Sequence, residues 1–167
     1  MTQPQHPDWM GANRKMSDQE IFDFLQGAVV ARVATIDENG MPYITPVWQE
    51  WDGSAMWIVP RERSAWVQHI KQNPNVAVSC ALDSGTYARV LFRGKAEIVF
   101  GPAPMEGQCL AVAQRMSVRY LGEEHGTVYL GGTDNRPRYL IKFVPESSRS
   151  WNGVEWAPYY TASDAER

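Results

Sequence analysis

Residues 59–79 read VPRERSAWVQHIKQNPNVAVS, and this stretch decides the fold. It places Trp66, Val67 and Ile70 at helical spacing, which predicts a short amphipathic helix over residues 64–72. Asn73-Pro74 then ends the helix, because proline disfavours helical backbone in the residue before it. The β-branched run that follows predicts a strand over residues 76–82. A strand, a helix and another strand are therefore expected in immediate succession.

Upstream of this stretch, strand patterns alternate with turns. Residues 29–36, 43–51 and 55–59 are rich in β-branched and aromatic residues and predict three strands. Asn39-Gly40 and Asp52-Gly53 separate them, since both dipeptides tolerate positive φ. We expect these strands to form an antiparallel meander. Before them, Ser17 and Glu20 have capping-box spacing, which predicts a helix that runs to about residue 26 and ends at Gly27.

Downstream, the clearest strand pattern covers residues 89–100, where apolar residues alternate with charged ones. Gly94 in its middle predicts a bulge or a sharp bend. We expect a helix over residues 105–121, a glycine-rich loop over 123–135, and a sixth strand over 139–144 with 148–151 as a candidate extension. Together these elements predict a mainly β protein with flanking helices, built as a six-stranded antiparallel barrel that is closed and so has no free sheet edges.

Composition narrows the class of protein. The 167 residues are enough for one domain over residues 17–153, with tails at 1–16 and 154–167. A net charge of −3 without a basic stripe argues against nucleic acid as a partner. No apolar leader and no membrane-length apolar run occurs, so we expect no membrane association and a cytoplasmic location. Cys80 and Cys109 lack CxxC spacing and indicate reduced thiols, and the three histidines lie too far apart in sequence to suggest a metal site.

The first candidate site is the segment Arg61-Glu62-Arg63-Ser64, which precedes the predicted helix. Ser64 has the character of an N-cap, so free backbone N–H groups should point out of the helix start. The helix dipole and the two arginines would favour a bound phosphate there. The alternative is a solvated loop whose arginines pair with nearby acids.

Two further segments carry candidate binding groups. Thr45-Pro46-Val47-Trp48 places a proline inside a strand, where free backbone groups could bond the edge of a heterocycle, although a plain edge strand explains the pattern better. Trp151, near the chain end, suits either a pocket or an interface. No nucleophile with an adjacent base occurs, so the catalytic residues stay unassigned and a cofactor would carry any redox chemistry.

The order of these segments resembles the pyridoxamine 5'-phosphate oxidase-like family. The resemblance covers residues 17–153 and rests on PYITPVW (42–48), residues 59–79, RVLFRGKAEIV (89–99) and YLIKFVPESSRSWNG (139–153). It implies a split β-barrel, a homodimer with the cofactor at the subunit interface, and FMN or a deazaflavin as the ligand. The cofactor-binding residues that it implies are Thr45, Pro46, Val47, Trp48, Val59, Pro60, Arg61, Arg63, Ser64, Arg89 and Trp151.

The resemblance implies an FMN-binding oxidoreductase that acts on a small acceptor. A deazaflavin-dependent reductase and a non-catalytic flavin- or haem-binding protein remain alternatives. Two departures from the family pattern matter. Ala65-Trp66 follows Ser64, where relatives often carry Arg-Lys, and residues 153–165 contain no arginine. The oxidase itself has an Arg-Leu motif near its C-terminus for the vitamin phosphate, so we expect no pyridoxamine 5'-phosphate oxidase activity.

Overall fold

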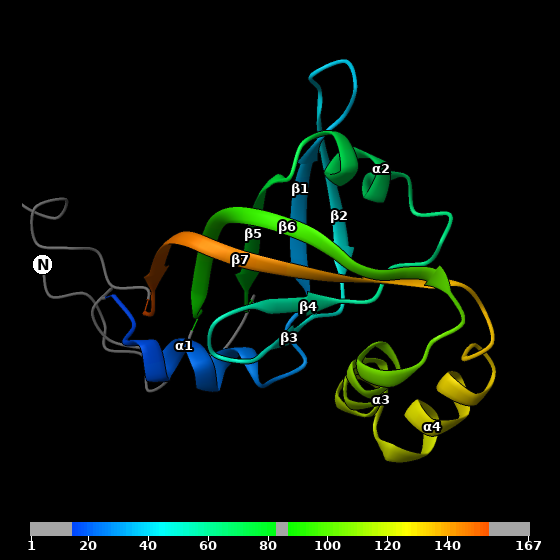
Figure 1. The fold of residues 1–167 in the computed structure, drawn as a ribbon. Coiled ribbons are helices and arrows are strands. Elements are labelled where there is room, and N and C mark those ends of the chain that lie inside the picture. Colours follow the sequence, from blue (N-terminus) through cyan, green and yellow to red (C-terminus); the bar gives the residue numbers. More distant parts are fainter. Residues whose placement is uncertain (1–14, 83–86, 154–167) are drawn as a thin grey trace, which may run out of the picture.

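The computed structural model describes residues 15–82 and 87–153, which form one sheet with helices outside it (Figure 1). Most of the two expected tails, and the arginine-free C-terminal segment, lie outside the described residues. The helices are α1 (Asp18–Leu25), α2 (Ala65–Gln72), α3 (Gly107–Leu121) and α4 (Glu123–Gly131). The strands are β1 (Ala31–Ile36), β2 (Pro42–Val47), β3 (Glu50–Trp51), β4 (Met56–Ile58), β5 (Asn75–Ala81), β6 (Arg89–Ala103) and β7 (Arg138–Trp151).

The sheet is antiparallel throughout, with the strand order β2-β1-β5-β6-β7-β4-β3. Its edge strands, β2 and β3, are consecutive in the chain, and Trp48 and Gln49 alone connect them. Because each residue spans at most about 3.6 Å, the two edges must come close together and the sheet curls into a barrel. No ladder joins β2 to β3 among the described strands, so the barrel is split there. The mainly β, split-barrel class is thereby confirmed.

The described residues form seven strands rather than six, because the segment expected as one strand over residues 43–51 is interrupted. At the break, Gln49 is fully buried and its side-chain amide donates to the backbone carbonyl of Leu25 (3.0 Å). The chain then starts β3, which pairs with β4, and β4 pairs with β7 on its other side. The antiparallel pairings expected between neighbouring segments are present, but the middle segment is broken into β2 and β3. The expected closed barrel is wrong, because β2 and β3 are the open edges of the sheet.

The helices largely follow their sequence signals. At α1 the predicted capping box is present: the Ser17 hydroxyl accepts from the Glu20 N–H, and the Glu20 carboxylate accepts from the Ser17 N–H. The glycine-rich loop expected over residues 123–135 is wrong, because most of it forms α4. Gly126 lies against α3, where a Cβ would come within 2.6 Å of the Ser117 backbone. This glycine therefore serves close helix packing rather than a turn.

Strands β6 and β7 run side by side and cross the whole barrel (Figure 1). Alternate residues of β6 from Val90 to Ala96 are buried, as predicted. Gly94 lies opposite Pro145 at a shift in the β6–β7 register, which confirms the expected bulge. The strand β7 continues through Pro145 to Trp151, so the candidate extension over residues 148–151 belongs to it.

Three findings bear on the class of protein. Cys80 and Cys109 are buried and free. Within residues 15–82 and 87–153, no cluster of three His, Cys, Asp or Glu side chains could hold a metal ion. In the same described part of the chain, every helix is too short or too polar to cross a membrane.

Candidate functional site

A cavity of about 460 Å³, here called the main pocket, opens where β2, the end of β4 and the start of α2 meet. Its volume lies within the range of small-molecule sites, roughly 300–1,000 Å³. Eight of the eleven predicted cofactor residues line it: Thr45, Pro46, Val47, Trp48, Val59, Pro60, Arg61 and Ser64. The other lining residues are Val30, Ile58, Trp66, Met116, Tyr129 and Arg138.

Backbone pairing between two distant segments builds the cationic end of the main pocket. The Tyr139 N–H donates to the Pro60 carbonyl (3.1 Å), and the Glu62 N–H donates to the Pro137 carbonyl (3.2 Å). As a result, Arg61 and Arg138 lie opposite each other in an antiparallel bridge. Two guanidinium groups from opposite halves of the chain therefore border one cavity.

Arg138 is an unusual arginine, because it is only 6% exposed and its Nε has no hydrogen-bond partner. Among the described residues, none of the acidic side chains pairs with it. Burial raises the pKa of the neighbouring Cys109 thiol to about 11, and the positive charge of Arg138 opposes that rise. A buried charge without a partner is strongly destabilising. An anionic group on a ligand would supply the missing partner.

Ser64 occupies the N-cap position of α2, as predicted, but its side chain makes no capping hydrogen bond. The Val67 N–H donates to the Ser64 carbonyl (3.1 Å), which leaves the Ser64 hydroxyl and the N–H groups of Ala65 and Trp66 at the helix start available to a ligand in the main pocket. Ala65-Trp66 offers no cation beside it, and Trp66 is buried. Arg61 and Arg138 supply positive charge at this end instead, and the whole arrangement suits a phosphate group.

The other wall of the main pocket consists of an edge strand and aromatic rings. Because β2 is the edge of the sheet, one side of its backbone lacks a strand partner, which is the environment that Pro46 predicted. Trp48 stacks on Tyr120 with ring centroids 5.0 Å apart and contacts Tyr129 at 5.4 Å. Unpaired backbone groups beside a stacked indole suit a planar heterocycle with a hydrogen-bonding edge.

The position of Trp48 is stabilised by α3, through the Tyr120 ring on which it stacks. The Tyr120 hydroxyl donates to the Val29 carbonyl (2.6 Å) and accepts from the Gln49 N–H (3.2 Å). Burial raises the pKa of the Tyr120 phenol, so the hydroxyl stays protonated. One turn earlier in the helix, Arg115 forms a bidentate ion pair with Glu50, at 2.6 and 2.9 Å. These contacts fix α3 against the link between β2 and β3.

We expect Tyr120→Phe to lower the free energy of unfolding by about 1–3 kcal/mol, because it leaves the N–H of the buried Gln49 without its acceptor. Tyr129→Phe is the matched control, since the Tyr129 hydroxyl has no hydrogen-bond partner among the described residues. Urea denaturation of the two variants measures the difference. Equal destabilisation by both would contradict the assigned role of the Tyr120 hydroxyl.

Three predicted residues do not line the main pocket. Arg63 lies in an adjoining groove. Arg89 and Trp151 pair across β6 and β7, with the Arg89 guanidinium 5.8 Å from the Trp151 ring, at the opposite end of these strands from Arg138. Sequence reasoning missed Arg138 and Tyr129. Tyr129 belongs to the segment expected as a loop, whereas no local pattern distinguishes Arg138.

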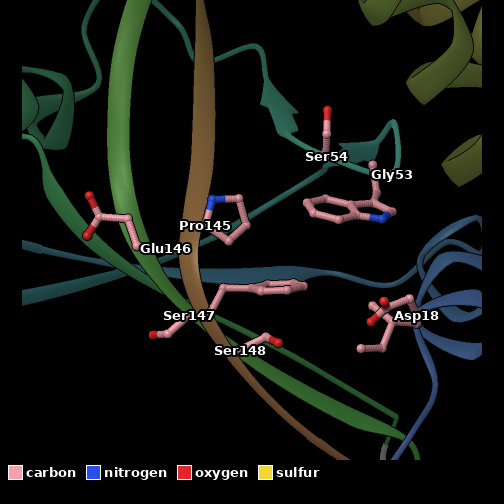
Figure 2. Close-up of a pocket in the computed structure, with 10 residues that line it drawn as sticks. Asp18, Gly53, Ser54, Pro145, Glu146, Ser147 and Ser148 are labelled. Atoms are coloured by element: carbon pink, nitrogen blue, oxygen red, sulfur yellow. The ribbon is translucent and has the colours of Figure 1, made fainter.

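A second cavity, of about 340 Å³, lies between α1, the turn from β3 to β4 and the middle of β7 (Figure 2). Figure 2 shows Asp18, Ser54, Glu146 and Ser148 around it, contributed by these separate elements. Among the described residues that line it, none is Lys or Arg. The Asp18 carboxylate would repel an anion, and the Glu146 carboxylate is already paired with Lys95 (3.7 Å), so the main pocket is the better site for a ligand that carries phosphate.

Solved structures with the same fold include two that are 26% identical in sequence. Conserved hypothetical protein Rv2991 from Mycobacterium tuberculosis matches with a TM-score of 0.66 over 90% of each chain. An F420 reductase matches with a TM-score of 0.59 over 75% of this chain and 93% of its own. The haem storage protein HutZ from Vibrio cholerae is 19% identical, with a TM-score of 0.57 over 77% of this chain and 89% of its own, and supports the fold alone.

No curated protein matches the chain. The family model described as pyridoxamine 5'-phosphate oxidase, however, matches residues 17–152. That match includes every described element and both arginines at the cationic end of the main pocket. Solved relatives also share the split barrel over most of the length of this chain. The chain therefore belongs to the pyridoxamine 5'-phosphate oxidase family.

Proposed function

We propose that this protein is an oxidoreductase that holds a flavin-type cofactor non-covalently in the main pocket. The observation that carries the proposal is the buried Arg138, whose Nε has no hydrogen-bond partner, beside Arg61 and Ser64, a set of donors that suits a phosphate. The cofactor ring would lie along Thr45–Trp48, where unpaired β2 backbone meets the Trp48 indole. A bound ring of this type supplies hydride or electron transfer, and the side chains named here bind and orient it.

FMN is the first candidate, because it ends in a single phosphate that the Arg61, Ser64 and Arg138 groups can bind together. A deazaflavin is the second candidate. It is favoured by the 26% identity to an F420 reductase over nearly all of that chain. The absorbance spectrum of the purified protein, followed by mass identification of what denaturation releases, distinguishes the two. A colourless protein that binds neither compound on titration would refute the proposal.

Arg61→Ala should weaken cofactor binding by about tenfold, because one charge-assisted hydrogen bond to the phosphate is lost. Arg93→Ala is the control, since Arg93 is an exposed arginine on β6 that lines none of these cavities. Quenching of tryptophan fluorescence on titration measures both affinities. The same affinity in the two variants would remove Arg61 from the site.

We also propose a homodimer in which a second copy covers β2. The first half of β2, residues 42–44, is exposed on both faces, and large apolar side chains there and just before it face solvent: Met41 at 62% exposed, Tyr43 at 42% and Ile44 at 66%. A cluster of this kind favours an interaction surface. A second copy would also offer its own Arg89 and Trp151, which lie away from the main pocket of their own chain.

Ile44→Glu should weaken dimer association by at least about tenfold, because it places a charge at the apolar centre of the interface. Val128→Glu is the control, since Val128 is 73% exposed on α4. Light scattering should give twice the chain mass of 18.9 kDa for the unaltered protein and for the control, but not for Ile44→Glu. A monomer mass for the unaltered protein at micromolar concentration would refute the dimer.

A further inference from the structure

The second cavity, of about 340 Å³, is separate from the proposed cofactor site, because it shares no lining residue with the main pocket. It exists because the pairing of β4 with β7 stops at Phe143. Beyond that residue β7 pairs with β6 alone among the described strands, and α1 and the turn from β3 to β4 lie opposite its free edge (Figure 2). The volume lies within the range of small-molecule sites, roughly 300–1,000 Å³.

Two aromatic rings give this cavity an apolar floor. Trp51 of β3 and Phe92 of β6 are stacked, with ring centroids 5.2 Å apart and an angle of 19° between the ring planes. Both belong to the core, at 8% and 3% exposed, and both line the cavity together with Ile21 of α1. A flat apolar surface of this kind suits the ring or the methylene chain of a small molecule.

The indole N–H of Trp51 has no hydrogen-bond acceptor in the part of the chain that the structure describes, although Trp51 is only 8% exposed. The neighbouring Trp57, by contrast, donates its indole N–H to the Asp52 carboxylate (2.7 Å). The Trp51 N–H is not enclosed by protein atoms, so it faces the cavity that Trp51 lines. Because a buried indole N–H normally finds a partner, an acceptor oxygen on a ligand would satisfy it.

The charge of the second cavity favours a cation. Within the described residues, the Asp18 carboxylate forms no ion pair with a basic side chain, and no Lys or Arg lines the cavity. Glu146 is already paired with Lys95, and Figure 2 shows Asp18 and Glu146 on opposite sides of β7. Asp18 is therefore the charge that a ligand would meet. Ser148 lies opposite Phe92 in the β6–β7 ladder, which places a hydroxyl on the same face as the aromatic floor.

We propose that the second cavity binds a small organic amine whose apolar body lies on the Trp51 and Phe92 rings. Its ammonium group pairs with the Asp18 carboxylate, and a hydroxyl or carbonyl oxygen on the same molecule accepts from the Trp51 N–H. Aromatic faces also attract an ammonium group directly. The cationic end of the main pocket would repel this ligand, because Arg61 and Arg138 border it. The two sites therefore select ligands of opposite charge.

Tyramine is the probe for this site, because it combines an aromatic ring, a phenolic oxygen and an ammonium group. Two analogues test the charge: 4-ethylphenol lacks the ammonium group, and 4-hydroxyphenylacetate carries a carboxylate instead. A third analogue, phenethylamine, lacks the phenolic oxygen. The titrations use the full chain and follow the indole N–H resonances by NMR, in which the resonance that Trp51→Phe removes identifies Trp51. Asp18→Asn is the charge variant, and Asp23→Asn is the matched control, since Asp23 is exposed on the same helix but does not line this cavity.

Tyramine should shift the Trp51 resonance and bind about fivefold more tightly than 4-ethylphenol, the upper value for an ion pair at an exposed carboxylate. Phenethylamine and 4-hydroxyphenylacetate should both bind more weakly than tyramine. In Asp18→Asn the preference for tyramine over 4-ethylphenol should fall to about twofold or less, whereas Asp23→Asn should keep it.

Three results would each overturn the inference: no tyramine binding at millimolar concentration, equal affinities for tyramine and 4-ethylphenol in the unaltered protein, or a preference that persists in Asp18→Asn. Tyramine binding that shifts other indole resonances but not that of Trp51 would also overturn it. None of these measurements involves a flavin. Their failure would therefore leave the proposed cofactor site untouched, and a failure of cofactor binding would leave this inference untouched.

Discussion

Arg138→Met should weaken cofactor binding by about a hundredfold, the upper end expected for one buried charge-assisted contact with a phosphate. The same substitution should leave the free energy of unfolding of the cofactor-free protein unchanged or raise it. The reason is that Arg138 is 6% exposed and its Nε lacks a partner, so the folded protein without a ligand bears an uncompensated desolvation cost. An apolar side chain of similar length removes that cost together with the anion contact.

Weaker cofactor binding without a loss of stability would distinguish a role in ligand binding from a purely structural role, which would lower the stability instead. Arg149→Met is the matched control: Arg149 is an exposed arginine on the same strand, β7, and lines none of the cavities described above. Fluorescence titration gives the affinity, and urea denaturation of the cofactor-free protein gives the stability. Loss of stability in Arg138→Met with unchanged affinity would mean that the guanidinium supports the fold and not the ligand.

Gly94→Ala should lower the free energy of unfolding by about 3 kcal/mol or more, the range of severe overpacking. A Cβ at Gly94 would overlap the carbonyl oxygen of Val144 and lie 2.8 Å from the Pro145 Cα. Both are backbone atoms of β7, so relief requires a shift of the β6–β7 pairing rather than a change of rotamer. The longest ladder of the barrel would have to move.

Gly131→Ala is the control for this substitution. Gly131 ends α4, and a Cβ there would meet no atom within 4 Å. Alanine in an open helical position should be neutral or slightly stabilising, by up to about 1 kcal/mol. Thermal or urea denaturation of the two variants provides the comparison. A Gly94→Ala protein as stable as the control would show that the β6–β7 bulge can open without cost.

Local patterns predicted most of the barrel, because the residues that form its hairpins and helices are close in sequence. Ser17 and Glu20 are three residues apart, so their spacing alone predicts the capping box. The alternation of apolar and charged residues along β6 predicts its buried face without knowledge of its partner strands. The errors arose where long-range packing decides the outcome. At the break, Gln49 donates a hydrogen bond to Leu25, and Gly126 lies within α4 where α3 packs closely against it.

The same distinction between local patterns and long-range packing explains which residues of the candidate site were predicted. Residues along β2 and the start of α2 carry local signals, such as Pro46 inside a strand and Ser64 before a helix, and the structure gathers them around one cavity. Arg138 has no such signal. Its place beside Arg61 follows from backbone pairing between segments that are far apart in the chain, and it lines a small cavity together with Met116 of α3 and Tyr129 of α4.

The bridge between Arg61 and Arg138 joins a segment that is synthesised early to one that is synthesised late. The chain leaves the ribosome from its N-terminus. The strand β4 pairs with β7, which begins some eighty residues later in the chain, so this pairing can form only after β7 has been synthesised. Closing so long a loop slows folding. The proposed anion site is incomplete until β7 has emerged and docked. A cofactor bound there would therefore not assist the early steps of folding and would stabilise only the nearly complete barrel.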